Sequence, residues 1–349
     1  MRVGIAGAGA IAMGYAALLL SRGHETSVWS PSGNRTADLL LGHPLKVSGA
    51  IEGAFRPGVC QSASELANAG VVVLALPAYG HRYVIDALVP HLDTRHAIII
   101  SGHLSFAALY LFKRLAERGL QIPVAVWNTT ALTCKAQSFT EVRVGTLRKM
   151  VSMAVVPGAM AGQGFDICVE LFGQRFALQD DLLTISLSNL NPQSHLAIAL
   201  CNLTRLERGE AWGQRENMTP TVGRFIESLD RERLALAEAC GKTVATVFDH
   251  YRNSFGLTGE SVAELAALQV GRGADVAGPK TIDSRYVLED VPFGLVPLLY
   301  LAEMTGTDIP LHRSGVAILS ACYGRNFMTE NDLLPEIDTA ELREILNYF

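Results

Sequence analysis

The chain has 349 residues and a formal net charge of -5 at pH 7; apolar residues make up 49% of it and charged residues 18%. This composition excludes a disordered chain. The negative charge gives no electrostatic reason to expect nucleic acid or an anionic membrane as a partner. Because a single core stops growing at roughly 250–300 residues, we expect two domains.

The six cysteines are scattered along the chain and form no Cys-x-x-Cys pair. This spacing argues against a zinc site and a disulfide framework and is typical of a reducing compartment. A first strand beginning at Arg2 leaves no room for a signal peptide, and the apolar runs are shorter than the roughly 20 residues that a membrane span needs. We therefore expect a cytoplasmic protein without a metal site or membrane contact.

The first half of the chain alternates between short apolar strands and helices. Residues 2–6 predict a buried strand, and residues 11–22 predict a helix that ends at Gly23. Further strands are expected at 26–30, 71–76, 96–100, 124–126, 151–155 and 177–178, and helices at 64–68, 81–92, 106–118 and 164–172. This alternation predicts an α/β fold, a Rossmann-type doubly wound parallel sheet over residues 1–185.

From residue 186 onward the pattern is helical. Thr219-Pro220 places a proline at a helix start, and Gly241 ends the apolar spacing of residues 222–240. Further helices are expected at 243–251, 259–269, 293–304, 312–323 and 340–346. We expect an all-α second domain over residues 186–349 that carries substrate and catalytic groups, with apolar faces that could support a homodimer.

The motif Gly7-x-Gly9-x-x-Ala12 lies between the first strand and the first helix. Gly7 permits the tight turn, Gly9 lets the backbone approach a pyrophosphate, and Ala12 keeps helix and strand close. The helix start at Ala10 and Ile11 offers N–H groups and a positive dipole end. This context predicts a nicotinamide dinucleotide site; a glycine-rich turn without a ligand is the alternative.

The end of the second strand bears on which dinucleotide binds. It holds Ser30 and lacks the Asp or Glu that would bond the ribose of NAD. Ser30 can bond a 2′-phosphate and Arg35 can clamp it, which favours NADP. NAD remains the alternative, with Arg35 a solvated loop residue. Leu76 and Pro77 end a strand expected at the switch point, where Pro77 either borders the ribose or only terminates the strand.

Two polar segments of the second half carry candidate chemistry. His195 follows Asn191-Pro192 at a helix start, where its imidazole could face the cofactor and transfer a proton near neutral pH. Taken alone, such a histidine is more often a structural group. In the second segment, residues 284–295, Glu289 and Asp290 could alternatively serve only as caps of the following helix.

Together these segments resemble a known family. N-P-x-x-H after the sheet domain and R-Y-x-x-E-D-V-P-x-G-L-V before a late helix are similar to the opine dehydrogenases (octopine/nopaline dehydrogenase family). The first half is similar as well, in G-A-G-A-I-A, W-S-P-S-G-x-R and A-L-P-x-x-x-H. Residues 128–135 resemble the family's E-T-x-x-x-x-C-R, with Asn128 and Lys135 in place of Glu and Arg.

The resemblance implies a role for each matching residue. His195 matches the catalytic histidine, Asp290 the aspartate that pairs with it, and Arg285 the arginine that binds a substrate carboxylate. Asn128 and Thr130 fall where the amino substrate would lie. The implied enzyme is an NAD(P)-dependent oxidoreductase acting on CH–NH donors. It would condense an amino acid with a 2-oxo acid such as pyruvate through an imine that hydride reduces.

Two other functions stay open on the sequence alone. A 2-oxo acid reductase of the ketopantoate reductase kind shares the Rossmann-plus-helices plan and would use a lysine. Lys242 and Lys280 are candidates without supporting context, and the set of His195, Arg285 and Asp290 would go unexplained. A non-catalytic dinucleotide sensor would bind the cofactor without turnover and would need no pair of His195 with Asp290.

Overall fold

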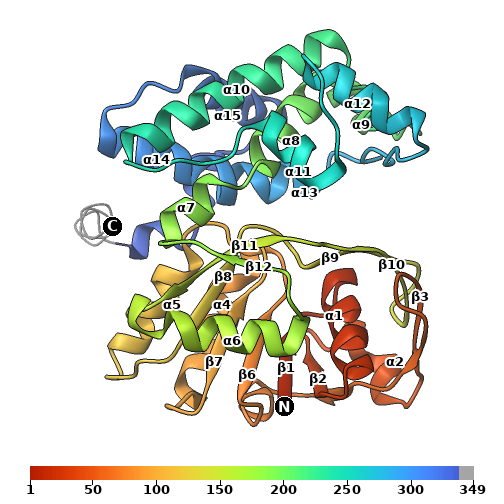
Figure 1. Ribbon diagram of the computed structural model, residues 1–349, viewed down its shortest axis with the longest axis vertical. Helices are drawn as coiled ribbons and strands as arrows, with labels where there is room; N and C mark the ends of the chain where they lie inside the picture. Colours follow the sequence, from red (N-terminus) through yellow and green to blue (C-terminus); the bar gives the residue numbers. More distant parts are fainter. Residues whose placement is uncertain (338–349) are drawn as a thin grey trace. The chain divides into compact units, whose positions relative to one another are not determined.

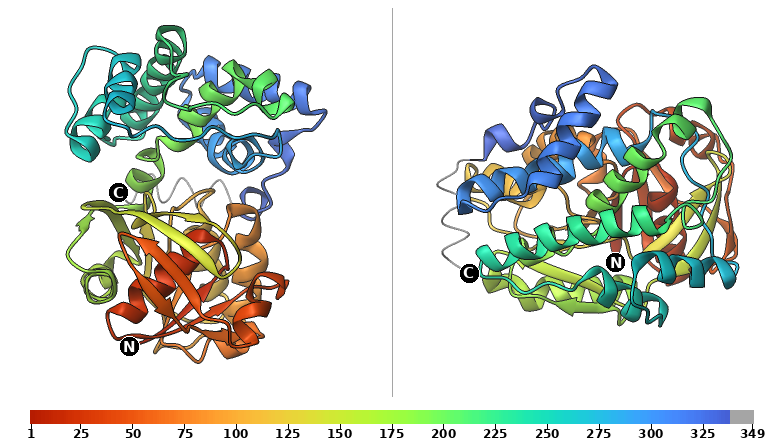
Figure 2. Two further views of the ribbon diagram at one scale, coloured as in Figure 1. Left: turned by 90° about the vertical axis from the view of Figure 1, so that its right-hand side faces the viewer. Right: turned by 90° about the horizontal axis from the view of Figure 1, so that it is seen from above.

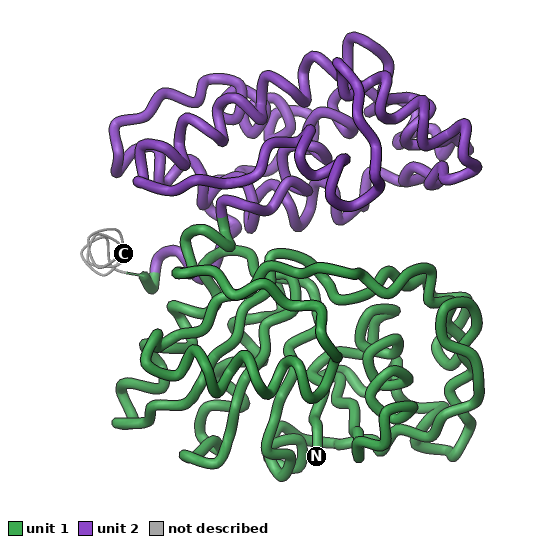
Figure 3. Tube along the Cα trace, viewed as in Figure 1, with its two compact units in different colours: residues 1–186, 336–349 green, residues 187–335 purple. Residues whose placement is uncertain are grey.

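The structure, a computed structural model, describes residues 1–337, which divide into two compact units (Figure 3). The first unit comprises Met1–Ser186 and takes up the chain again at Glu336, and the second comprises Leu187–Pro335. The predicted boundary lies one residue earlier, and the prediction left Glu336 in the helical half. The helix expected at 340–346 lies outside the described residues.

Within the described residues, the first unit contains an eight-stranded sheet (Figure 1). In spatial order its strands are β12 (Phe176–Leu178), β11 (Val151–Val156), β8 (Val124–Trp127), β7 (Ala97–Ile100), β6 (Val71–Leu74), β1 (Arg2–Ala6), β2 (Glu25–Trp29) and β5 (Gly58–Cys60). The run from β8 to β5 is parallel throughout, whereas β11 pairs antiparallel with β8 and parallel with β12. The expected Rossmann-type α/β fold is confirmed, with two reversed strands at one edge.

The helices of this unit connect the strands and cover the sheet (Figure 1). They are α1 (Ala10–Ser21), α2 (Ala37–Leu40), α3 (Ala63–Leu66), α4 (His81–Leu88), α5 (Ala107–Ala116) and α6 (Ala161–Phe172). A further helix, α7 (Leu182–Leu187), follows the last strand and ends at the first residue of the second unit. An aromatic cluster joins α1 and α6 to the sheet: Phe172 lies edge-on to both Tyr15 and Trp127, at centroid distances of 5.2 and 4.9 Å. Such edge-to-face pairs add to the burial of large rings.

A second, four-stranded sheet was not predicted. Its order is β4 (Gly53–Phe55), β3 (Leu45–Gly49), β10 (Glu141–Leu147) and β9 (Leu132–Ala136). A Cβ atom at Gly14 would lie 2.9 Å from Cδ1 of Leu132 and 3.3 Å from Sγ of Cys134, so this glycine lets β9 lie against α1. β4 and β9 are short and largely exposed, so their sequence carries little strand signal. β3 and β10 do alternate between buried and exposed residues, a strand pattern that the prediction missed.

The hydroxyl of Tyr15 ties α1 to two loops at the carboxyl edge of the sheet. It accepts a hydrogen bond from the amide of Ala131 at 2.9 Å and bonds the hydroxyl of Ser101 at 2.6 Å. Burial raises the pKa of Tyr15 to about 12, so the phenol stays protonated and donates to Ser101. The loops near the expected cofactor are therefore anchored to the first helix.

The second unit is helical (Figure 2). Its helices are α8 (Asn191–Cys201), α9 (Leu203–Arg208), α10 (Pro220–Ala239), α11 (Val247–Phe255), α12 (Val262–Gly271), α13 (Arg285–Leu288), α14 (Val296–Thr305) and α15 (Pro310–Tyr323). The all-α second half is confirmed in type. The predicted helix over 293–304 is two elements, however: a π-helical turn, η5 (Val291–Leu295), precedes α14. Pro292 lacks an N–H for the regular ladder, and its carbonyl accepts from Nδ2 of Asn331 at 2.9 Å.

A buried ion pair on α10 holds the start of the unit in place. Arg233, 1% exposed, donates from Nε and Nη2 to Oδ1 of Asp230. The same guanidinium donates to the carbonyls of Leu187 and Ala245, and Asp230 accepts from the amide of Val247. Because every charge in this group has hydrogen-bond partners, its desolvation is compensated.

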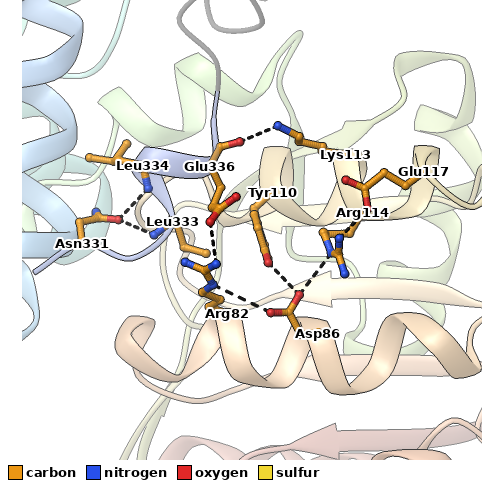
Figure 4. A network of polar contacts seen from close by, with 10 residues as sticks. All are labelled: Arg82, Asp86, Tyr110, Lys113, Arg114, Glu117, Asn331, Leu333, Leu334 and Glu336. Atoms are coloured by element: carbon orange, nitrogen blue, oxygen red, sulfur yellow. Dashed lines mark hydrogen bonds and ion pairs between the residues drawn. The ribbon is translucent and has the colours of Figure 1, made fainter.

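Polar contacts surround the point where the chain re-enters the first unit (Figure 4). The carboxylate of Glu336 bonds Arg82 of α4 at 2.6 Å, and its backbone carbonyl accepts from Nζ of Lys113 on α5 at 2.8 Å. Asp86 accepts from the hydroxyl of Tyr110 at 2.7 Å. These contacts with α4 and α5 are the physical reason why Glu336 belongs to the sheet unit and not to the helical half.

No helix within residues 1–337 is both long and apolar enough to cross a membrane. The same residues contain no group of three or more His, Cys, Asp or Glu side chains placed to hold a metal ion. All six cysteines are free thiols.

The stability of the second unit should depend on pH through Glu232 of α10. Burial acts to raise the pKa of Glu232, but bonds from His312 Nδ1 and from the amides of Leu311 and His312 outweigh it and lower that pKa. Its contribution is therefore present above the ordinary pKa of about 4.5 and lost as the pH falls through the folded value. We expect Glu232→Gln to lower the free energy of unfolding by roughly 1–3 kcal/mol at pH 7.

Urea denaturation of both proteins at pH 7 and pH 4 measures this effect, and the difference should shrink at the lower pH. Glu238→Gln, an exposed change on the same helix, is the matched control and should stay within about 0.5 kcal/mol of the wild type. An equal difference at both pH values would contradict the assignment.

Candidate active site

The glycine turn has the geometry that a dinucleotide needs. Gly7 has a φ of 129°, and a Cβ atom there would lie 2.2 Å from the carbonyl oxygen of Ala75. Its amide donates to the carbonyl of Trp29 at 2.8 Å, which joins the turn to the end of β2. Only glycine satisfies both the backbone conformation and the close approach.

The residues after this turn fit a pyrophosphate. A Cβ atom at Gly9 would meet nothing within 4 Å, so the space in front of the helix is open on the protein side. Gly9 provides no side-chain cap, and the amides of Ala10, Ile11 and Ala12 open α1. The N-terminus of α1 therefore offers uncapped N–H groups and a positive dipole end, while the buried Ala12 keeps α1 close to β1.

Ser30 and Arg35 follow the end of β2. The carbonyl of Ser30 accepts from the amide of Gly33 at 2.9 Å, which closes a tight turn. Arg35 follows this turn and is exposed. Its guanidinium carbon lies 5.7 Å from the ring centroid of Phe139. The turn brings a hydroxyl and a cation to the strand end without a carboxylate.

Leu76 and Pro77 lie just beyond β6. The carbonyl of Leu76 contacts Nε2 of His81 at 3.2 Å, and the buried His81 begins α4. Pro77 has extended backbone angles and precedes a short 3-10 turn. Strand termination explains Pro77 fully here, and its position beside a ribose stays a prediction.

In the second unit, His195 and Asp290 are bonded. Nδ1 of His195 donates to Oδ2 of Asp290 at 2.7 Å, and the two side chains are 18% and 12% exposed. His195 lies one turn inside α8 and not at its first residue, because Asn191-Pro192 forms the first helical turn, where a proline's missing N–H costs no hydrogen bond. Asp290 precedes η5 but makes no capping bond there. The carboxylate thus orients an imidazole instead of serving the helix end.

Arg285 lies four residues before Glu289, and the two side chains form an ion pair. Glu289 is 3% exposed at its side chain, whereas Arg285 is 66% exposed. The buried carboxylate of Glu289 accepts a hydrogen bond from Nε of Arg285. This bond restricts the directions in which the exposed guanidinium of Arg285 can point. Sequence reasoning treated Glu289 only as a possible cap; its i, i+4 spacing from Arg285 was the signal that could have found this pair.

Tyr286 contacts His195 and Gln214 contacts Tyr286, and neither contact was predicted. The ring of Tyr286 stacks on the imidazole of His195, with centroids 3.6 Å apart and an interplanar angle of 7°. The hydroxyl of Tyr286 donates to Oε1 of Gln214. Gln214 lies 72 residues before Tyr286, so no local pattern in the sequence could have indicated this contact.

The predicted amino-substrate residues lie in the first unit and make local bonds. Oδ1 of Asn128 accepts from the amide of Ser152 at 3.1 Å, and the hydroxyl of Thr130 donates to the carbonyl of Leu132 at 2.7 Å. Both side chains are half-buried. These bonds hold the loop between β8 and β9, and contact with a substrate stays a prediction.

The sequence is similar to that of known dehydrogenases. The profile of the alpha-helical domain of NAD/NADP octopine/nopaline dehydrogenases matches residues 178–323. An opine dehydrogenase of Arthrobacter sp. (strain 1C) is 27% identical over 334 residues, which cover 94% of this chain and 92% of that protein. The chain is therefore similar to octopine/nopaline dehydrogenases over its helical half and to an opine dehydrogenase over nearly its whole length.

Solved structures of this fold are also similar. An octopine dehydrogenase in complex with NADH and agmatine has a TM-score of 0.78 at 17% identity, covering 93% of this chain and 90% of that one. A yersinopine dehydrogenase with bound NADP+ has a TM-score of 0.73 at 13% identity, covering 100% of this chain and 99% of that one. The resemblance to opine dehydrogenases drawn from the motifs is confirmed, and the ketopantoate-type reductase is not favoured.

The two glycines of the predicted dinucleotide turn should respond differently to substitution. In Gly9→Ala the added methyl meets no protein atom within 4 Å, so we expect the free energy of unfolding to change by less than about 0.5 kcal/mol. The methyl would occupy the approach to the helix N-terminus, so NAD(P)H affinity should fall by roughly tenfold or more.

Gly7→Ala is the comparison variant. Its Cβ would collide with the carbonyl of Ala75, so the free energy of unfolding should fall by at least about 1–2 kcal/mol. Thermal unfolding and titration of NADPH fluorescence measure the two quantities. Unchanged cofactor affinity in a stably folded Gly9→Ala protein would contradict the proposed placement.

Proposed function

We propose that this chain catalyses the NAD(P)H-dependent reductive condensation of an amino acid with a 2-oxo acid such as pyruvate. The product is an N-(carboxyalkyl) amino acid. The observation that carries the proposal is the bonded pair of His195 and Asp290, with Arg285 five residues before Asp290, in the part of the chain that the octopine/nopaline dehydrogenase profile matches. The enzyme is an NAD(P)-dependent oxidoreductase acting on CH–NH donors.

The chemistry needs a base that also gives back a proton. The amine must lose a proton before it attacks the oxo carbon, water leaves when the imine forms, and the reduced nitrogen gains a proton. With Nδ1–H donated to Asp290, the neutral imidazole of His195 presents Nε2 as the proton acceptor. Asp290 keeps this tautomer and stabilises the imidazolium that forms.

The 2-oxo acid needs a cation for its carboxylate. Arg285 supplies a planar fork of donors that can bind a carboxylate through two parallel bonds. Its support by Glu289 limits the directions in which this fork can point. Fixing the carboxylate also fixes the neighbouring oxo or imine carbon, which lowers the entropic cost of the reaction.

When bound, the reduced nicotinamide supplies the hydride. The Gly7–Ala12 turn and the start of α1 would hold its pyrophosphate, as the fit of Gly7 and Gly9 supports. Ser30 and Arg35 would bind a 2′-phosphate, and this favours NADP over NAD. A yersinopine dehydrogenase structure contains NADP+ and an octopine dehydrogenase structure contains NADH, so both dinucleotides occur on this fold.

Asn128 and Thr130 are proposed to border the amino substrate, since their loop is tied to β11 and to the start of β9. We also propose a cytoplasmic location, which six free thiols support. A homodimer stays a prediction.

An amino-acid panel with pyruvate and each reduced dinucleotide tests the function. We expect NAD(P)H oxidation that requires both pyruvate and an amino acid. His195→Gln should lower kcat by roughly 100-fold or more, because no group then takes the proton at this position. Oxidation that proceeds with pyruvate alone would favour a simple 2-oxo acid reductase instead, and binding without oxidation would favour a sensor.

Arg35→Ala tests the choice of dinucleotide. Loss of a charge-assisted bond to a phosphate should raise KM for NADPH by roughly tenfold or more and leave KM for NADH nearly unchanged. Arg143→Ala removes another exposed arginine of the first unit and should change neither. Equal effects on both dinucleotides would show that Arg35 does not read the 2′-phosphate.

A further inference from the structure

One hydrogen bond does not fix an imidazole ring. The contact of Nδ1 with Asp290 holds one edge of the His195 ring, but the ring can still swing about that contact. Such a swing would move Nε2, which lies on the opposite side of the ring. A proton acceptor must be held to within a fraction of an ångström of its line of attack. A second restraint on the ring face is therefore required.

Tyr286 provides that restraint. Its ring is nearly parallel to the imidazole, at 7°, and its centroid is 3.6 Å from the imidazole centroid. At this distance the two faces are in van der Waals contact, so the imidazole cannot rotate toward Tyr286 without a clash. An electron-rich ring face also attracts a cation, so the contact becomes more favourable when His195 is protonated.

Tyr286 is itself held at both ends. Its amide donates to the side chain of Ser284 at 3.2 Å, and its hydroxyl donates to Oε1 of Gln214. The amide of Gln214 donates to the carbonyl of Val276 at 2.7 Å, so the acceptor belongs to a hydrogen-bonded backbone pair and not to an isolated loop. Burial and the charge of Asp290 raise the pKa of Tyr286 to about 12. The phenol therefore remains a donor and is not a proton acceptor at neutral pH.

We propose that Tyr286 is a positioning residue for the reaction: it holds the face of the His195 imidazole, and Gln214 holds Tyr286. The inference rests on the proposed function, in which His195 transfers the proton. Asp290 then determines the tautomer of the imidazole, while the stack determines its plane. Tyr286 itself touches no reacting atom in this assignment.

Histidine resonances test the stack independently of activity. In ¹H–¹³C spectra of histidine-labelled protein, a carbon-bound proton of His195, assigned with His195→Gln, should show an upfield ring-current shift. The shift should persist in Tyr286→Phe and vanish in Tyr286→Leu. A wild-type resonance without this shift would overturn the stack, whatever the enzyme's activity.

Steady-state kinetics tests the positioning role. Tyr286→Leu should lower kcat by roughly 3- to 30-fold, the range expected for loss of a stacked or cation–π partner, with little change in KM for NADPH. Tyr286→Phe should lose a smaller factor. Tyr251→Phe removes another tyrosine hydroxyl of the same unit, bonded to the sulfur of Met218, and should keep the wild-type kcat.

A double-mutant cycle tests the contribution of Gln214. If Gln214 acts through the hydroxyl of Tyr286, the double variant Gln214→Leu/Tyr286→Phe should be no slower than the slower single variant. Both substitutions leave the ring of Tyr286 in place, so the cycle remains informative if Tyr286→Leu folds poorly. Additive losses would overturn the coupling. An unchanged kcat in a folded Tyr286→Leu protein would overturn the positioning role and leave the proposed function standing, whereas a wild-type protein without condensation activity would overturn both.

Discussion

The hydrogen bond between His195 and Asp290 joins side chains that are 95 residues apart in the sequence. The helical unit must hold the two segments that carry these side chains at a fixed separation. The distance from Nδ1 of His195 to Oδ2 of Asp290 is 2.7 Å, so a shift of either α8 or the segment after α13 would break the bond. α8 packs against α10, α13 and η5. Buried polar groups on α10 extend this hold: Arg233 binds the start of the unit, and Glu232 binds the start of α15.

The short segment from Arg285 to Asp290 divides three tasks among neighbouring residues. Successive side chains on a helix point about 100° apart, so adjacent carboxylates at a helix end serve different partners. Glu289 accepts from Arg285, while Asp290 accepts from His195. The ring of Tyr286 lies on the same imidazole. The segment from Arg285 to Asp290 therefore holds an exposed guanidinium and two groups that contact His195, the ring of Tyr286 and the carboxylate of Asp290.

The proposed cofactor site of the sheet unit relies on backbone rather than on side chains. Gly7 and Gly9 contribute an unusual φ angle and an open approach, and α1 contributes its first amides. Such a site specifies a pyrophosphate but neither the dinucleotide nor the substrate. In the proposed function, Ser30 and Arg35 make the finer distinction between the two dinucleotides.

Local sequence was enough to determine the strand and helix alternation, the glycine turn and the resemblance to opine dehydrogenases. Each of these depends on neighbours within about one element, through apolar periodicity, a required φ angle or a contiguous motif. The family resemblance implied the pairing of Asp290 with His195, which the structure shows as a hydrogen bond. Tertiary structure alone decided the second sheet and the contact of Tyr286 with Gln214. These features depend on which distant segments pack together, and no spacing along the chain encodes that distance.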